Sequence, residues 1–291
     1  MKQQITREIV LQHLPKRVSD GHKGIFGRLG VICGSLDMSG AARLVNRAAY
    51  RSGAGLVFAF AGKSFASYLK NDMPEVIVKT VKESREGFFD KQFYQENKSD
   101  LENCGTLVFG CGIGQHPELA VVLEDLLLSY KNNILIDADG LNLLSQNLSL
   151  LKRKKANVII TPHIKEMSRL TGLSVGDILA NKEKTASAFA VQHNITVVLK
   201  SYQTIIADPG GQVYVNKTGN SALSKAGTGD VLSGMIAGFL VQSDQLLGAA
   251  LCGVYLHGLA AELASAEMSE YAVMATDVAD YLSKSIIKIS H

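Results

Sequence analysis

Cysteine is scarce in this sequence, and its spacing argues against two common uses of the residue. The four cysteines among 291 residues are Cys33, Cys104, Cys111 and Cys252, and none of them form a C-x-x-C pair. Each lies in an apolar or glycine-rich segment, which disfavours a zinc site and a disulfide scaffold. We therefore expect reduced, buried thiols and a cytoplasmic protein.

The sequence also lacks a strong charge bias and a clear export or membrane segment. Its net charge of +3 is too small and too dispersed to predict a nucleic-acid partner. The first twenty residues carry scattered charges without the apolar stretch of a signal peptide. The longest apolar candidate, residues 246–263, is interrupted by His257 and Glu262. Because a membrane span needs about 20 predominantly apolar residues, we interpret this segment as a buried helix.

The composition and the apolar patterns predict one packed α/β domain over residues 1–291. Apolar residues make up 46% of the chain, and strand-like and helical patterns alternate along it, which is typical of a parallel sheet. The polar segment 82–103 is interpreted as an exposed insertion. Strands are expected at 30–33, 56–61, 106–110, 134–137, 158–161, 195–200 and 203–207, and helices from 40 and at 117–130, 163–171 and 176–193.

Glycine or a polar residue follows almost every predicted strand. These residues are Gly34-Ser35, Cys111-Gly112-Ile113-Gly114, Asp137-Ala138-Asp139, Thr161-Pro162-His163 and Lys200. Ligands of open α/β sheets bind beyond the carboxyl ends of the strands, so we expect these residues to converge on one crevice. The glycines could belong to plain loops, or they could let the backbone approach a ligand closely.

The charged residues at the strand ends also have structural interpretations. Asp137 and Asp139 alternate and should point the same way, and one of them could cap the following helix. His163 could form a capping pair with Glu166, or it could contact a ligand. Lys200 ends a strongly apolar strand, which suggests an anionic partner such as phosphate, unless its side chain snorkels to solvent.

The segment Gly227-Thr228-Gly229-Asp230 precedes the clearest helical pattern in the chain. Apolar residues recur with helical spacing from Val231, and Gly234 and Gly238 allow that helix to pack closely against another element. Free N–H groups and the helix dipole favour an anion at the helix N-terminus. Asp230 could be a simple helix cap. An anion-binding turn followed by a general base explains all four residues together.

Six segments form a specific pattern when they are taken together and in this order. They are "HKGIFGRLGVICGSLDMSGAARL" (22–44), "GCGIG" (110–114), "DADGLN" (137–142), "TPHIKEMSRL" (161–170), "VVLKSYQT" (197–204) and "NKTGNSALSKAGTGDVLSGMIAGFLVQ" (216–242). In these segments, which cover nearly the whole chain, it resembles the ADP-dependent NAD(P)H-hydrate dehydratase family. The resemblance implies a ribokinase-like α/β fold in three layers, with a mostly parallel central sheet flanked by helices.

The resemblance also implies a lyase that repairs damaged nicotinamide cofactors. Members of this family dehydrate (6S)-NADHX and NADPHX to NADH and NADPH at the expense of ADP, giving AMP and phosphate. The implied course is phosphorylation of the substrate hydroxyl, followed by loss of phosphate. By analogy, Asp230 is the base on that hydroxyl, and Gly227, Thr228 and Gly229 form the anion hole.

Ligand contacts are implied by the same resemblance. The nucleotide would bind at Lys200, Ser201, Tyr202, Gln203, Thr204 and Gly229. The damaged dinucleotide would contact Ala41, Ala42, Gly112, Gly114, Asp139, Asn142, His163, Asn220 and Asp230. Mg²⁺ is expected on the phosphates, held by them and by water without a dedicated set of protein ligands.

The family pattern further implies a homo-oligomer, specifically a tetramer, and a separate epimerase that acts on the same metabolite, since this chain begins at the dehydratase motif. Three positions depart from the pattern. Cys33 and Ser201 stand where the family often has glycine, and Cys111 stands where it usually has proline.

Two other functions share parts of the pattern. A ribokinase-like small-molecule kinase of the hydroxyethylthiazole or pyridoxal kinase type would use the same anion hole and base but release a phosphorylated product. A non-catalytic nucleotide sensor would keep the pocket without turnover. The segments "TPHIKE" and "KTGN" favour the dehydratase, and the intact Gly-Thr-Gly-Asp sequence argues against the sensor.

Overall fold

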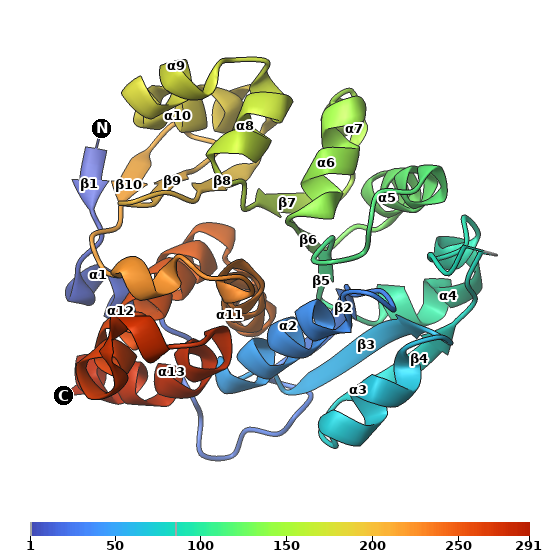
Figure 1. Ribbon diagram of the computed structural model, residues 1–291, viewed down its shortest axis with the longest axis horizontal. Helices are drawn as coiled ribbons and strands as arrows, with labels where there is room; N and C mark the ends of the chain where they lie inside the picture. Colours follow the sequence, from blue (N-terminus) through green and yellow to red (C-terminus); the bar gives the residue numbers. More distant parts are fainter. Residues whose placement is uncertain (1, 85) are drawn as a thin grey trace.

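Ten strands form one sheet that separates two layers of helices (Figure 1). The structure is a computed structural model that describes residues 2–84 and 86–291. The spatial order of the strands is β1-β10-β9-β8-β7-β6-β5-β2-β3-β4. Their bounds are β1 Lys2–Gln4, β2 Arg28–Ile32, β3 Leu56–Gly62, β4 Ile77–Val81, β5 Thr106–Phe109, β6 Asn133–Ile136, β7 Asn157–Ile160, β8 Thr196–Leu199, β9 Ile205–Ala207 and β10 Val213–Val215.

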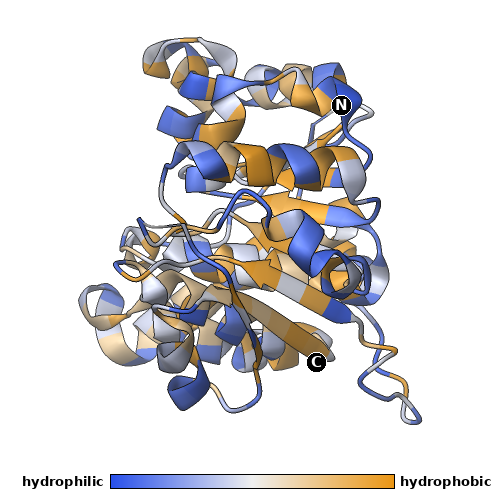
Figure 2. Ribbon diagram, turned by 90° about the vertical axis from the view of Figure 1, so that its right-hand side faces the viewer, coloured by the Kyte–Doolittle hydropathy of each residue, from blue (hydrophilic) through white to orange (hydrophobic). Residues whose placement is uncertain are grey.

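The sheet is parallel from β4 to β8, whereas β9 runs antiparallel to both β8 and β10. The central strands β5, β6 and β8 are buried along their whole length. Their sequences are almost purely apolar because helices cover both faces of a parallel sheet. Figure 2 shows this distribution, with the hydrophobic colour concentrated on the strands between the helices.

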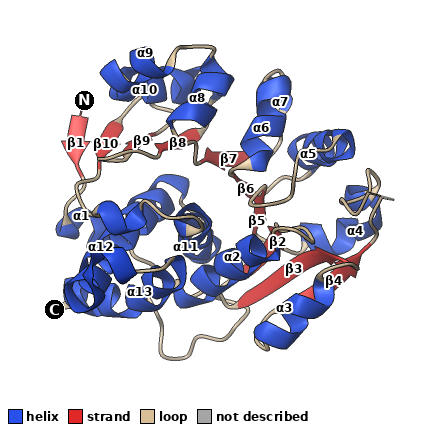
Figure 3. Ribbon diagram, in the orientation of Figure 1, coloured by secondary structure: helices blue, strands red, loops and turns tan. Residues whose placement is uncertain are grey.

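Helices pack on both faces of the sheet (Figure 3). One apolar cluster joins one face to α1, α2, α3, α11, α12 and α13, and a second joins the other face to α4 through α10. This arrangement confirms the predicted three-layer α/β fold. The bounds are α1 Arg7–His13, α2 Ser39–Arg51, α3 Ala66–Asp72, α4 Phe93–Glu102, α5 Pro117–Ser129, α6 Asp139–Gln146, α7 Leu150–Arg153, α8 Ile164–Thr171, α9 Val175–Ala180, α10 Lys182–His193, α11 Thr228–Ser243, α12 Leu246–Ala272 and α13 Ala275–Ser290, with a 3₁₀ turn η1 at Ser221–Leu223.

The structure corrects two expectations about secondary structure. The interpretation of 82–103 as an exposed insertion was wrong, because Phe89 and Phe93 are buried and α4 packs against the sheet. The many charged residues of this segment obscure its few buried apolar positions in the sequence. The helix expected at 176–193 is two helices, α9 and α10, that meet at the non-helical backbone of Asn181.

Helix α12 contains the apolar segment that was interpreted as a buried helix. Among residues 2–84 and 86–291 it is the one helix that is long and apolar enough to cross a membrane. However, 72% of its most apolar window is buried inside the protein. The helix therefore packs in the core, as the polar interruptions in its sequence predicted.

Two glycines bring α11 into backbone contact with α2. A Cβ atom added at Gly234 would overlap the carbonyl oxygen of Val45, and one added at Gly238 would lie 2.7 Å from the carbonyl oxygen of Ala49. Because these neighbours are backbone atoms, they cannot move aside as a flexible side chain would. The predicted close packing along Gly234 and Gly238 is thus confirmed. It fixes the position of α11 against α2.

We predict that Gly234→Ala lowers the free energy of unfolding by about 1 to 3 kcal/mol, because the added methyl group must push two helices apart. A matched control is Gly176→Ala in α9, where the nearest atom to the added Cβ is 3.8 Å away. That exposed helical site should gain about 0.5 to 1 kcal/mol. Urea unfolding of both variants measures the difference. An unchanged midpoint for Gly234→Ala would contradict the backbone contact.

Candidate active site

The ends of neighbouring strands converge on one edge of the sheet, as predicted. Strands β2, β5, β6, β7 and β8 are adjacent and parallel, so the residues that follow them emerge on the same side. The N–H of Gly34 donates to the carbonyl of Cys111 at 2.7 Å, and the N–H of Lys200 donates to the carbonyl of Pro162 at 2.7 Å. These bonds tie the loops after the strands to one another.

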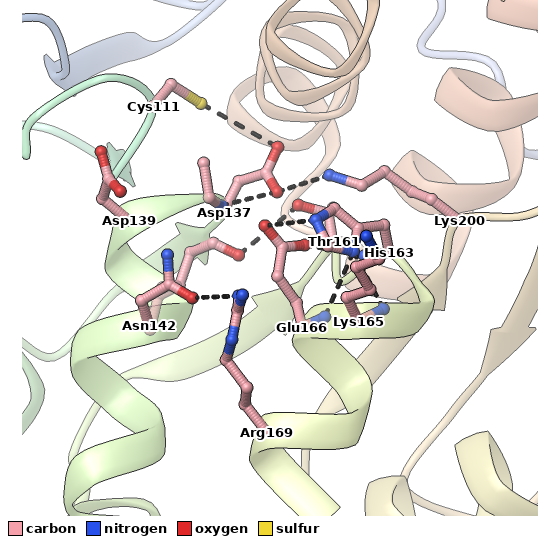
Figure 4. Close-up of polar contacts among 12 residues, drawn as sticks. Cys111, Asp137, Asp139, Asn142, Thr161, His163, Lys165, Glu166, Arg169 and Lys200 are labelled. Atoms are coloured by element: carbon pink, nitrogen blue, oxygen red, sulfur yellow. Dashed lines mark hydrogen bonds and ion pairs between the residues drawn. The ribbon is translucent and has the colours of Figure 1, made fainter. Parts of the chain in front are cut away.

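A buried ion pair lies at the centre of this edge (Figure 4). The ammonium of Lys200 lies 2.6 Å from Oδ1 of Asp137, whose side chain is 1% exposed. The hydroxyl of Ser233 on α11 donates to Oδ2 of the same carboxylate at 2.7 Å. The side chain of Lys200 is only 20% exposed, so it does not snorkel to solvent.

The charge on Lys200 is maintained by its neighbours. Burial by itself would lower its pKa, but the negative charges of Asp137 and Glu166 and the hydrogen bond to Asp137 outweigh burial, so the pKa is raised. A Cβ added at Gly229 would lie 3.6 Å from Nζ of Lys200. The lysine thus presents a permanent positive charge beside the first turn of α11.

Asp139 has a different position from Asp137, which corrects one expectation. Strand β6 ends at Ile136, so its alternation does not extend to Asp139, and the two carboxylates have different partners. Asp139 accepts from the N–H of Gly114 at 2.9 Å. Neither acid caps α6, because the N-cap position is Ala138 and no side chain caps it.

His163 forms the predicted capping pair with Glu166. Its Nδ1 accepts from the N–H groups of Lys165 and Glu166, and Glu166 accepts from the N–H of His163 at 2.8 Å. Nε2 of the ring lies 3.3 Å from Oε1 of the same Glu166, so both ring nitrogens have partners within the capping pair. Burial raises the pKa of Glu166 to about 7, and burial lowers the pKa of His163. The ligand contact of His163 stays a prediction.

Helix α11 begins one residue after Gly227, which the structure places in the left-handed region with φ 88°. The N-cap is therefore Gly227, and the interpretation of Asp230 as a simple cap is wrong. The hydroxyl of Thr228 lies 2.8 Å from the carbonyl oxygen of Leu223, so it anchors the preceding loop. N–H groups in a first helical turn have no acceptor within the helix and can bind an anion.

Asp230 lies in that first turn and has the properties of a base. Burial and the negative charge of Asp137 raise the pKa of its carboxyl to about 6, although a hydrogen bond with Cys111 opposes the shift. A carboxylate in this range is a stronger proton acceptor than an exposed aspartate, yet it is ionised at neutral pH. The turn of α11 thus combines anion-binding N–H groups with a base.

A cavity of 540 Å³ opens next to this turn. It is lined by all the residues predicted to contact the nucleotide, namely Lys200, Ser201, Tyr202, Gln203, Thr204 and Gly229. Its remaining walls come from the segment 216–224, the first turns of α11 and the middle of α12, including Val254, His257 and Gly258. Sequence reasoning did not identify His257 as a site residue. The available signal was that His257 is one of two charged or titratable residues, with Glu262, that interrupt the apolar run 246–263.

Of the residues predicted to contact the dinucleotide, some lie together around Ala41 and Gly112, whereas others lie elsewhere. A Cβ added at Gly112 would lie 2.8 Å from Cβ of Ala41, so these two residues face each other. Gly114 follows Gly112 in the same loop, and its N–H donates to Asp139. The side-chain oxygen of Asn142 on α6 accepts a hydrogen bond from Arg169 at 2.8 Å. Ala42, in contrast, is buried in the core, and Asn220 lines the 540 Å³ cavity instead.

This fold and this site define a class of protein. A mostly parallel sheet with an anion-binding helix start and a base beyond its strand ends is the ribokinase-like arrangement. The hydroxyethylthiazole kinase structure from Pyrococcus horikoshii shares the fold, with a TM-score of 0.58 at 16% identity over 95% of this chain and 92% of that one.

The particular family follows from closer relatives. The family model for NAD(P)H-hydrate dehydratase matches residues 29–284. The ADP-dependent (S)-NAD(P)H-hydrate dehydratase of Bacillus subtilis is 33% identical over 96% of each chain. The crystal structure of the B. subtilis ADP/ATP-dependent enzyme with ATP/Mg²⁺ aligns with a TM-score of 0.85 at 31% identity, covering 99% of this chain and 98% of that one. The chain therefore belongs to the NAD(P)H-hydrate dehydratase family.

Some relatives are longer than this chain. The bifunctional NAD(P)H-hydrate repair enzyme Nnr of Moorella thermoacetica is 34% identical over 92% of this chain, but the match covers only 51% of that protein. The chain thus spans about half the length of such relatives.

We predict that the Lys200–Asp137 pair is energetically coupled. Lys200→Met should lower the free energy of unfolding by about 2 to 4 kcal/mol, because it leaves a buried carboxylate without its cation. Asp137→Asn added to that variant should restore part of the loss, since the amide needs no counter-charge. A double-mutant cycle by urea unfolding at pH 7 measures this coupling. Simple additivity of the two losses would show that the pair is not coupled.

Proposed function

We propose that this chain, as one domain, catalyses the ADP-dependent dehydration of (6S)-NADHX and NADPHX to NADH and NADPH, with AMP and phosphate as the other products. The observation that carries the proposal is Asp230, a carboxyl with a pKa raised to about 6 in the anion-binding first turn of α11. It lies beside a cavity of nucleotide size. Membership of the dehydratase family supports this choice of substrate.

The chemistry requires two steps, because a hydroxyl group is a poor leaving group. In the first, Asp230 accepts the hydroxyl proton as the substrate oxygen attacks the β-phosphorus of ADP, and the bond from that phosphorus to AMP breaks. In the second, the carbon–oxygen bond breaks and phosphate leaves, while the adjacent carbon loses a proton and the ring double bond forms. The protein supplies position, charge and a base, which suffices for phosphoryl transfer.

The nucleotide would occupy the 540 Å³ cavity, with its β-phosphate at the first turn of α11. The ammonium of Lys200 lies next to Gly229, 3.6 Å from the position of a Cβ added there, and would share the phosphate with the N–H groups of that turn. Ser201, which replaces the usual glycine, has its hydroxyl 3.2 Å from Nζ of Lys182. That lysine also donates to the carbonyl of Tyr202 at 2.8 Å, so it fixes the loop that forms the rim of the cavity.

The dinucleotide would occupy the other side of Asp230, against Ala41, Gly112 and Gly114, with Asp139, Asn142 and His163 nearby. Gly112 packs tightly against this segment, since a Cβ added there would lie 2.8 Å from Cβ of Ala41 and 3.0 Å from Cβ of Met38. We now assign Asn220 to the nucleotide, since it lines the cavity. Ala42 supports Ala41 from the core.

Mg²⁺ would be held mainly by phosphate oxygens and water. Across residues 2–84 and 86–291 no group of three or more His, Cys, Asp or Glu side chains is arranged to hold a metal. Both oxygens of the buried Asp137 carboxylate are already engaged by Lys200 and Ser233. When bound, the ion neutralises charge on the transferring phosphate. A tetrameric assembly, a separate epimerase and a cytoplasmic location remain part of the proposal.

The decisive test is restoration of NADH from NADHX. Purified protein with Mg²⁺ and ADP should convert NADHX to NADH, which is followed by the absorbance of the reduced nicotinamide. A small-molecule kinase would instead consume nucleotide and accumulate a phosphorylated product, and a sensor would bind nucleotide without turnover. Absence of restored NADH under these conditions would overturn the proposal.

We predict that Asp230→Asn binds ADP with nearly the wild-type affinity but turns over about 100- to 10,000-fold more slowly, because the amide cannot accept the hydroxyl proton. Calorimetric titration with ADP and the NADH assay measure the two properties separately. Near wild-type turnover would show that another group is the base.

We also predict an acidic limb in the pH profile of kcat/KM near pH 6. The pKa of Asp230 is raised to about 6, so below that pH the carboxyl is protonated and activity falls about tenfold per pH unit. Glu166, with a pKa raised to about 7, is the other titrating acid of the site. Glu166→Gln keeps an oxygen for the N–H of His163 and is the control. Loss of the limb in that variant would assign it to Glu166.

A further inference from the structure

His257 connects the long core helix to the anion-binding turn. Helices α11 and α12 lie side by side (Figure 1), and His257 on α12 lines the 540 Å³ cavity between them. The residue is 7% exposed. Its Nε2 lies 2.9 Å from the carbonyl oxygen of Thr228. Burying a polar ring costs free energy because the ring loses its hydrogen bonds to water, and the bond to Thr228 offsets this cost.

The bonded carbonyl belongs to the peptide group that also contains the N–H of Gly229. A peptide group is planar and rigid, so fixing its C=O direction also fixes the direction of its N–H. A hydrogen bond accepted at the oxygen further polarises the group and makes the N–H a better donor. His257 therefore acts through this peptide group on the N–H of Gly229, a residue whose added Cβ would lie 3.6 Å from Nζ of Lys200.

The ring acts as a neutral donor. Burial lowers the pKa of His257 to about 4, the hydrogen bond to Thr228 opposes this, and the charge of Lys200 lowers it further. Because a carbonyl oxygen can only accept, the single proton of the neutral ring is on Nε2. His257 thus orients the anion hole without adding a second titrating cation beside Lys200.

The neighbourhood of His257 on α12 is rigid. The hydroxyl of Thr218 donates to the carbonyl of Tyr255 at 2.8 Å. The N–H of Gly219 donates to Glu262 at 2.7 Å, and a Cβ at Gly258 would overlap Thr218. The loop on one side of the cavity and the anion hole on the other are therefore fixed to consecutive turns of one helix.

We propose that His257 is a positioning residue of the anion hole, which holds the Thr228–Gly229 peptide so that the N–H of Gly229 points at the phosphoryl group of the bound nucleotide. This inference rests on the proposed function for the identity of the nucleotide. The hydrogen bond itself does not depend on which substrate the site processes.

The test compares two substitutions that differ in one donor. His257→Leu removes the donor and keeps an apolar side chain of moderate size. His257→Gln retains an N–H group near the position of Nε2. Circular dichroism confirms that both variants fold, and titration calorimetry gives the affinities for ADP and for adenosine, which lacks phosphate.

His257→Leu should reduce the ratio of ADP affinity to adenosine affinity about tenfold, the effect of one lost hydrogen bond. His257→Gln should keep that ratio within about threefold of wild type, and it should retain kcat more fully than the leucine variant. An equal fall in both variants, or an unchanged ratio in His257→Leu, would overturn the proposal, because either result is what a packing role gives.

The ¹H chemical shift of the Gly229 amide, measured by ¹⁵N NMR without ligand, separates this inference from the proposed function. Loss of the hydrogen bond to the Thr228 carbonyl depolarises the peptide group, so the amide proton should shift upfield in His257→Leu relative to wild type and His257→Gln. If wild-type protein does not bind ADP but this order is observed, the nucleotide assignment fails and the positioning role stands. An unchanged shift in all three proteins would refute the positioning role.

Discussion

The ion pair between Asp137 and Lys200 is the interaction on which the rest of the site depends. It joins the ends of β6 and β8 across β7, and through Ser233 it also attaches α11 to the sheet. The pair fixes a cation beside the turn that binds the anion. The same carboxylate, by its negative charge, helps to raise the pKa of Asp230. In the proposed mechanism, one buried pair thus contributes both to the charge around the phosphate and to the strength of the base.

The site separates its tasks by the elements that perform them. In the proposed mechanism, backbone N–H groups and Lys200 bind the phosphate and Asp230 accepts a proton, while α12 lines the cavity through His257. Such a division suits chemistry that depends on position and charge. The two cysteines that depart from the family pattern, Cys33 and Cys111, follow neighbouring strands and are buried at this edge.

The parts of the fold and site that depend on local sequence could be predicted. The apolar strands of the parallel core, the Gly-Thr-Gly-Asp turn and the strand-end position of Lys200 all follow from periodicity and from helix-end chemistry. What could not be predicted depends on contacts between distant segments. The partner of Lys200 is 63 residues away and the carbonyl bonded by His257 is 29 residues away. The burial of part of 82–103 could not be predicted, because its few apolar residues form no clear pattern in the sequence and are buried only by their contact with the sheet.

The glycine contact between α2 and α11 has a mechanical consequence. Helix α2 carries Ala41, on the side proposed for the dinucleotide, and α11 carries the first turn proposed to bind the phosphate of the nucleotide. Because their backbones touch at Gly234 and Gly238, the spacing between these two walls is set by hard contact and cannot shorten. In the proposed function, this contact would fix the distance between the two bound ligands.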